Sequence, residues 1–143
     1  MKIEKMLLPF DDSPPSLNAA NYALSLAKLS KAHVTIVTCY DEGNWEVSGI
    51  SDFLIEGIKA NRRKMAEEIL KKAGVIFVDQ GVDYQLEAVA GSPGEVFAKQ
   101  AKSKEYDLII MGSHGHSDIA GLFLGSVTHK VLNTIYCPIL IVP

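Results

Sequence analysis

Three glycines and a serine stand at a spacing that suits the binding of an anion. Two residues separate Gly112 from Gly115, and nine more separate Gly115 from the pair Gly125 and Ser126. Glycine allows positive φ angles and, because it has no Cβ atom, lets the backbone come close to a ligand. A helix that begins at Ser126 adds unpaired N–H groups and the positive end of a helix dipole. The spacing therefore predicts a phosphate site; a plain turn with glycines for tight packing is the alternative interpretation.

Histidines enrich the same segment. His114 and His116 have ring nitrogens that can bond a phosphate or, together with His129, hold a metal ion. Three histidines without a cysteine or an acidic partner at ligand spacing are a weak signal for a metal, so solvent-exposed loop histidines are the default interpretation. Lys130 follows one turn into the expected helix and is either near the phosphate or simply exposed.

The composition is that of an ordinary globular domain. The chain has 143 residues, 48% hydrophobic and 22% charged, which fits a single domain over residues 1–143. Its formal net charge of −3 argues against a nucleic-acid partner and against binding to an anionic membrane. No apolar run approaches the roughly 18 residues that a membrane-spanning helix requires. The N-terminus lacks the long apolar region and cleavage site of a secretory signal.

The two cysteines also give an indication of the cellular compartment. Cys39 and Cys137 lie in or beside strand-like runs. Buried reduced thiols are expected there, in preference to a disulfide or a nucleophile, and such thiols are typical of a cytoplasmic protein.

Apolar and β-branched runs alternate with stretches of helical periodicity. Strands are expected over residues 5–10, 33–40, 84–89, 107–111 and 138–142. Helices are expected over residues 14–30, over 51–74, from the turn at 91–94 through Ala101, and over 126–135. Ser13 is the expected N-cap of the first helix, with Pro14 in its first turn.

The long second helix is amphipathic and is expected to stop at Gly74. One apolar face is predicted to carry Leu54, Ile58, Met65, Ile69 and Leu70. The segment 75–78 is expected to be irregular or extended, and residues 41–49 form the least regular stretch of the chain.

Strict alternation of strand and helix predicts an α/β fold with three α/β/α layers and a parallel five-stranded sheet, Rossmann-like in type. Right-handed crossovers place every strand-to-helix loop at the carboxyl edge of the sheet, where ligands bind in such folds. Two of these loops carry suitable chemistry: residues 11–13 after the first strand and 112–125 after the fourth.

Taken together, these features resemble the universal stress protein family, in its single-domain ATP-binding branch, over essentially the whole chain. Four segments carry the resemblance: the apolar-Pro-apolar-Asp opening at 6–13, the turn at 91–93, the glycine pattern at 112–126, and the final strand at 137–142. The resemblance implies the adenine nucleotide alpha hydrolase-like arrangement with strand order 3-2-1-4-5. It also implies a bound ATP or AMP, with Mg²⁺ possible on the phosphates.

The resemblance assigns one set of residues to the adenosine part. Asp11 falls where the family aspartate lies beside the ribose and adenine, although an N-cap or turn former is the alternative. Pro9 matches a position that lines the adenine pocket, and Cys39 falls where backbone groups contact the base. Met111 and Gly112 would lie along the adenosine.

A second set is assigned to the phosphates. Gly115 would let the loop approach them, and Gly125, Ser126, Val127 and Thr128 would offer backbone N–H groups. The hydroxyls of Ser126 and Thr128 would add donors.

Asp12 departs from the family pattern, which usually has a small residue there, often glycine. An additional carboxylate would either repel a triphosphate or help to hold Mg²⁺ with the phosphates. The plainest interpretation is a side chain that points to solvent, so Asp12 is a weak metal candidate.

Three functions stay open from the sequence. The first is a nucleotide-dependent switch or regulator; the second is a slow ATPase or autokinase that uses Asp11 or Asp12 with Mg²⁺. The third is an interaction module that binds no nucleotide. No GxxxxGK[ST] loop is present, and no GxGxxG follows the first strand. The resemblance also implies a homodimer through residues 138–142, with a buried strand in a monomer as the alternative.

Overall fold

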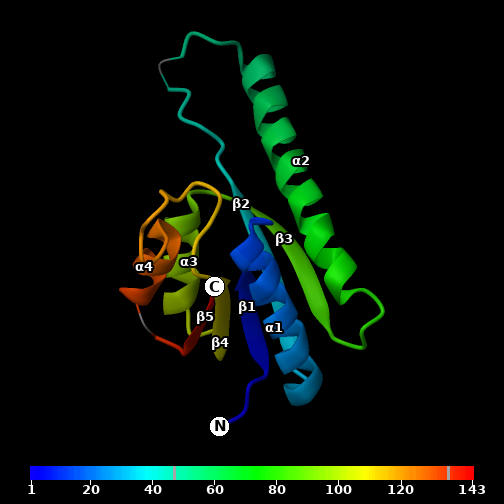
Figure 1. Cartoon of the computed structure of the whole chain (residues 1–143). Helices are drawn as coiled ribbons and strands as arrows, with labels where there is room; N and C mark the ends of the chain where they lie inside the picture. The colour runs from blue at the N-terminus through cyan, green and yellow to red at the C-terminus, as the bar shows by residue number, and fades with distance from the viewer. Residues whose placement is uncertain (47, 135) are drawn as a thin grey trace.

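A parallel sheet runs through the centre of the molecule, with helices on both of its faces (Figure 1). The computed structural model describes residues 1–46, 48–134 and 136–143. In chain order the elements are β1 (Lys5–Pro9), α1 (Pro14–Ser30), β2 (His33–Tyr40), α2 (Asp52–Phe77), β3 (Tyr84–Ala90), α3 (Pro93–Lys102), β4 (Leu108–Gly112), α4 (Ser126–Leu132) and β5 (Ile139–Val142). The predicted alternation of strands and helices is confirmed. The last helix ends at Leu132, earlier than expected; the expected end, residue 135, itself falls outside the described residues.

The strand order is β3-β2-β1-β4-β5, which confirms the predicted fold class. β1 is central: Met6 pairs with Val34 of β2 on one side and with Leu108 of β4 on the other. The chain reverses its direction of winding between β1 and β4. The loops that follow these two strands therefore meet at the carboxyl edge of the sheet, where ligands of α/β proteins bind.

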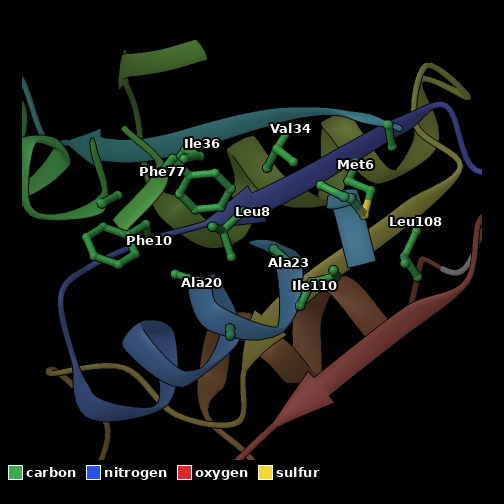
Figure 2. Close-up of a cluster of buried hydrophobic side chains, with 14 of the residues drawn as sticks. Met6, Leu8, Phe10, Ala20, Ala23, Val34, Ile36, Phe77, Leu108 and Ile110 are labelled. Atoms are coloured by element: carbon green, nitrogen blue, oxygen red, sulfur yellow. The ribbon is translucent and has the colours of Figure 1, made fainter. Parts of the chain in front are cut away.

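α1 and α2 cover one face of the sheet, and the core beneath them is closely packed (Figure 2). The side chains in this layer come from alternate strand positions, such as Met6 and Leu8 of β1, and from small residues of α1, such as Ala20 and Ala23. Alanines allow α1 to lie close to the sheet. Ser13 caps α1 as predicted, since its side chain accepts a hydrogen bond from the Ser16 N–H.

α3 and α4 cover the opposite face (Figure 1). Leu7 of β1 and Ile109 of β4 point into this second layer and pack with Phe97 of α3 and Val131 of α4. Because both faces are covered by helices, the central strands are apolar along their length rather than alternating.

The predicted end of α2 is wrong. The helix continues through Gly74 to Phe77, which is fully buried and lies with its ring centroid 5.5 Å from that of Tyr84. Gly74 serves packing rather than termination, since a Cβ atom there would lie 3.3 Å from Leu86 Cδ1 of β3. The extra turn is held by burial of Phe77, which outweighs the low helix propensity of glycine.

The predicted apolar face of α2 is correct only in part. Leu70 is buried, but Leu54 and Met65 are 57% and 60% exposed, and Ile55 and Ala66 are buried instead. In Figure 1 the first half of α2 extends beyond the sheet. Only a narrow row of residues there has anything to pack against.

The segment between β2 and α2 forms neither helix nor strand in its described part. The Arg62 guanidinium lies over the Trp45 ring, 5.9 Å from its centroid, and donates a hydrogen bond of 2.8 Å to the Asp41 carbonyl oxygen. These contacts attach the segment to α2. Among the described residues, no helix has the length and apolar character needed to cross a membrane.

Candidate functional site

A pocket of about 160 Å³ opens where β1 and β4 end. Eight of the residues selected from the sequence line it: Pro9, Asp11, Cys39, Met111, Gly112, Gly115, Val127 and Thr128. Gly125 and Ser126 do not line the pocket, but they flank it, because they directly precede Val127 in the chain. The structure therefore gathers at one sheet edge residues that are more than a hundred positions apart in the sequence.

The lining of the pocket is mainly apolar. Pro9, Met111 and Val127 lie on its wall together with Ile69 of α2 and Phe97 of α3, which the sequence analysis did not select. Such a surface suits a flat apolar group, because burial of apolar area stabilises binding.

Cys39, a free thiol, lines the same pocket. Burial raises the pKa of this thiol to about 12, so it stays protonated at neutral pH. Cys137 is also a free thiol, and burial raises its pKa as well, with a smaller contribution from the Asp107 charge. Because a thiol reacts as its thiolate, neither cysteine is suited to act as a nucleophile.

Asp11 lines the pocket and is bonded to both of the loops that meet there. One carboxylate oxygen accepts hydrogen bonds from the backbone N–H and the hydroxyl of Ser13, the former at 3.0 Å. The other oxygen accepts from the His116 N–H at 3.1 Å. Each carboxylate oxygen has two lone pairs, so Asp11 keeps capacity for further donors from a ligand.

The three glycines of the motif allow the backbone to lie close to neighbouring residues; they do not provide unusual dihedral angles. None of the three has a positive φ angle, and in this loop only Gly121 does. A Cβ atom on Gly112 would lie 2.8 Å from Pro15 Cβ, and one on Gly115 would lie 2.6 Å from Asp11 Oδ2. The glycines therefore let the end of β4 and the following loop pack tightly against Asp11 and the start of α1.

Hydrogen bonds join this loop to the helix that follows it. The Thr128 hydroxyl, in the first turn of α4, donates to the Gly112 carbonyl oxygen at 2.9 Å, and the Gly125 N–H donates to the Ser113 carbonyl at 2.7 Å. The Gly125 amide is thus used by the fold itself. Ser126, Val127 and Thr128 open the helix, where backbone N–H groups have no partner inside the helix.

One further residue, Asp118, occupies the start of α4, and the sequence analysis did not select it. Its Oδ2 accepts a hydrogen bond from the Gly115 N–H at 2.6 Å. Its Oδ1 accepts from the Ser126 N–H at 2.9 Å and from the Ser126 hydroxyl at 3.0 Å. Burial raises the pKa of this carboxyl, but the hydrogen bonds outweigh that effect and hold the pKa below its ordinary value of 3.8. Asp118 is therefore an anion bound to the two Ser126 donors that the resemblance assigned to a phosphate, and also to the Gly115 N–H.

Asp12 has partners within the chain for both oxygens. Oδ1 lies 2.6 Å from His116 Nε2, and Oδ2 is paired with the Lys72 ammonium group of α2. Burial raises the pKa of Asp12, but the bonds from Lys72 and His116 prevail and lower it. Asp12 thus ties the glycine loop to α2 and does not line the pocket.

The remaining polar residues near the loop do not converge on one point. His114 Nε2 donates to the Leu122 carbonyl at 2.7 Å, and its Nδ1 lies 3.0 Å from the Ser113 hydroxyl. Lys130 lies over Gly94 of α3, whose Cβ atom would meet Lys130 Cδ at 3.0 Å. In the part of the chain that the structure describes, no group of three or more His, Cys, Asp or Glu side chains is placed to hold a metal ion.

Comparison with known proteins gives consistent matches over the full chain. The family model described as "Universal stress protein family" matches residues 2–143. The universal stress protein MJ0531 of Methanocaldococcus jannaschii is 32% identical over 148 residues, which cover 97% of this chain and 81% of that protein. The universal stress protein YxiE of Bacillus subtilis is 32% identical over 96% of this chain and 97% of its own length.

Solved structures agree with this match. The M. jannaschii protein MJ0577 is 26% identical with a TM-score of 0.84, over 99% of this chain and 96% of that one. A universal stress protein crystallised in complex with cAMP is 29% identical with a TM-score of 0.69, over 99% of this chain and 98% of that one.

Proposed function

The chain belongs to the universal stress protein family, and from this premise we propose that it binds an adenine nucleotide, ATP or AMP, in the pocket where β1 and β4 end. One observation carries the proposal. A single pocket combines an apolar wall, the Asp11 carboxylate, and the glycine loop that leads to α4. The relative crystallised with cAMP supports the choice of an adenine nucleotide.

We assign the apolar wall to the adenine ring and Asp11 to the ribose. Pro9 and Met111 offer flat contact area, and the backbone of Cys39 offers polar groups at the end of β2. The Asp11 carboxylate accepts hydrogen bonds from ribose hydroxyls without giving up its bonds to Ser13 and His116. Each hydrogen bond to a charged group contributes roughly 1.5–3 kcal/mol.

We assign the phosphates to the donors that surround Gly115 and the first turn of α4. These are the N–H groups of Gly115, Ser126, Val127 and Thr128, with the Ser126 hydroxyl. The Thr128 hydroxyl is already bonded to Gly112 and is assigned to the fold instead. Several such bonds are consistent with micromolar affinity, about −8 kcal/mol.

Magnesium does not fit Asp12 as a ligand. Both oxygens of Asp12 are held by cationic or polar partners of the chain, Lys72 and His116. Any Mg²⁺ in the complex is accordingly expected to arrive bound to the nucleotide phosphates and to have Asp12 outside its ligand set.

We propose a regulatory role rather than rapid turnover. A change of shape or of partner on nucleotide binding suits a pocket whose lining comes from several elements, among them β1, β4, α2 and α3. Incubation with radiolabelled ATP separates the two functions: retention of unchanged ATP supports the switch, whereas steady release of ADP supports a slow ATPase. The cytoplasmic location expected from the sequence stays a prediction.

We also propose that two chains associate through β5. This strand lies at one edge of the sheet, and three of its four residues are only half-buried. An unpaired edge with apolar side chains is a suitable surface for the same strand of a second chain.

Isothermal titration calorimetry tests the nucleotide proposal. We expect wild type to bind AMP, and Asp11→Asn to weaken that binding by about tenfold because the amide is a poorer acceptor. Glu105→Gln makes the same change of charge in the exposed segment before β4 and should leave the affinity within about twofold. Absence of binding by adenosine, AMP and ATP at millimolar concentration would refute the proposal.

A further inference from the structure

We propose that Asp118 is an internal competitor for the nucleotide phosphates, and that it sets the preference of the site among adenine ligands. This inference rests on the proposed function. It concerns a residue that neither the glycine pattern nor the family resemblance assigned to the site.

The contacts of Asp118 coincide with those assigned to a phosphate. Its two oxygens accept hydrogen bonds from the Gly115 N–H, the Ser126 N–H and the Ser126 hydroxyl, all within 3.0 Å. A carboxylate presents two anionic oxygens to these donors in the way that a phosphate presents two of its own. Both anions cannot use the same three donors, so a phosphate that binds there must displace the carboxylate.

The motif glycines make room for this carboxylate. A Cβ atom on Gly125 would lie 2.9 Å from Asp118 Cγ, and one on Gly115 would lie 3.6 Å from Asp118 Oδ2. Asp118 also lines the pocket itself, next to Ser117 and Gly115. The carboxylate therefore sits inside the proposed site.

Charge adds to the competition. Asp11 Oδ2 also lies close to Gly115, where a Cβ atom would meet it at 2.6 Å. No ion pair to Asp118 is present among the described residues. A phosphate that enters while Asp118 is in place thus meets two carboxylates, and like charges at short range repel. Neutral adenosine avoids this cost.

The segment around Asp118 can move without disturbing the core. Ile119 and Phe123 are 74% and 92% exposed, and Leu122 is 46% exposed. Few buried contacts hold the segment, so its displacement costs mainly the three hydrogen bonds of Asp118 and, where Leu122 moves with it, the bond from His114 Nε2 to the Leu122 carbonyl. The expected outcome is that adenosine binds with Asp118 in place and ATP binds with Asp118 displaced.

A purely structural role makes a different prediction. If Asp118 only caps α4, its removal lowers the stability of the loop and weakens all adenine ligands to the same degree. If Asp118 competes, its neutralisation strengthens ATP binding and leaves adenosine binding unchanged. The ratio of the two dissociation constants separates these roles.

The test is calorimetry of adenosine and of ATP, without magnesium, on wild type, Asp118→Asn, Asp118→Ala and the charge-matched control Glu105→Gln. We expect Asp118→Asn to lower the Kd for ATP about tenfold, with the Kd for adenosine changed less than about twofold and both constants unchanged in Glu105→Gln. An unchanged ratio of the two constants in both Asp118 variants overturns this inference alone. Absence of binding by both adenosine and ATP in every protein overturns the proposed function, and the inference with it.

A measurement on wild type keeps the inference testable if the Asp118 variants fail to fold. In ¹H–¹⁵N correlation spectra, adenosine should leave the amide signals of Gly115 and Ser126 nearly unshifted, because their bonds to Asp118 persist. ATP should shift both signals and that of Asp118. Equal shifts of these amides by the two ligands contradict the competition.

Discussion

The hydroxyl of Thr128 donates a hydrogen bond of 2.9 Å to the carbonyl oxygen of Gly112, sixteen residues earlier in the chain. Thr128 is 2% exposed, so the bond is shielded from water. It fixes the first turn of α4 against the last residue of β4. The whole glycine loop is thereby closed at its base, and the pocket walls from both elements keep their relative position.

Loss of this bond should destabilise the protein. Thr128→Val keeps the shape of the side chain but leaves the buried Gly112 carbonyl without its partner, which costs about 1–3 kcal/mol. Thr128→Ser keeps the hydroxyl and should retain more of the stability. Urea denaturation measures the free energy of unfolding of each variant, and equal loss in the two variants would show that the hydroxyl is not what matters.

Much of the fold could be predicted because strand patterning and helix patterning agree with one another. The apolar strands, the Ser13 cap and the alternation of elements each indicate a parallel sheet. The last turn of α2 could not be predicted, because Gly74 is a helix-stop signal locally and its actual contact, Leu86, lies on another element. Helix propensity is overridden there by the burial of Phe77.

The site was predictable in its position but not in its hydrogen bonding. The glycine spacing singled out a loop that lines the pocket, yet the space left at Gly115 and Gly125 is taken by Asp11 and Asp118, and that at Gly112 by the start of α1. No local signal marks Asp118, since an N-cap residue normally directly precedes its helix and Asp118 lies eight residues before Ser126. Such a cap exists only once the loop has folded back.

Glycines within α2 allow a matched test of local packing. Gly57 is in the exposed half of the helix and a Cβ atom there would meet nothing within 4 Å, so Gly57→Ala should stabilise the protein by about 0.5–1 kcal/mol. Gly74→Ala should give a smaller gain or a loss, because its Cβ atom would lie 3.3 Å from Leu86 Cδ1. Thermal unfolding of both variants shows which substitution stabilises the protein more. A larger gain in stability from Gly74→Ala than from Gly57→Ala would contradict the packing described here.

Acid should destabilise the protein partly through Asp107. Its carboxylate accepts hydrogen bonds from the Glu4 and Lys5 N–H groups, both at 2.9 Å. These bonds hold the pKa of Asp107 below its ordinary 3.8, so the stabilisation is present above pH 3.8 and is lost as the pH falls through the folded-state pKa.

Asp107→Asn should therefore lower the free energy of unfolding at neutral pH, and the difference from wild type should shrink as the pH falls. Urea denaturation of wild type and variant between about pH 6 and about pH 3 measures the difference. A difference that stays constant over this range would mean that the ionised form is not favoured by folding.

Association through β5 can be tested at Ile141, which is half-buried at the sheet edge and pairs with Met111 within the chain. Light scattering should give a dimer mass for wild type and a monomer mass for Ile141→Arg, because the charge would be placed at the proposed interface. Leu29→Arg adds the same charge on α1, at a position 82% exposed, and should stay dimeric. A monomeric wild type would rule out the proposed interface.

The most direct measurement of the nucleotide proposal is a titration of the ¹⁵N-labelled protein with ATP, followed by ¹H–¹⁵N correlation spectra. We predict that the largest shifts occur at Gly112, Gly115 and residues 126–128, with smaller ones beside Asp11, and that β3 and the far end of α1 stay unchanged. Unchanged spectra at millimolar ATP, or shifts confined to surfaces away from the carboxyl ends of β1 and β4, would contradict the assignment of this pocket as the nucleotide site.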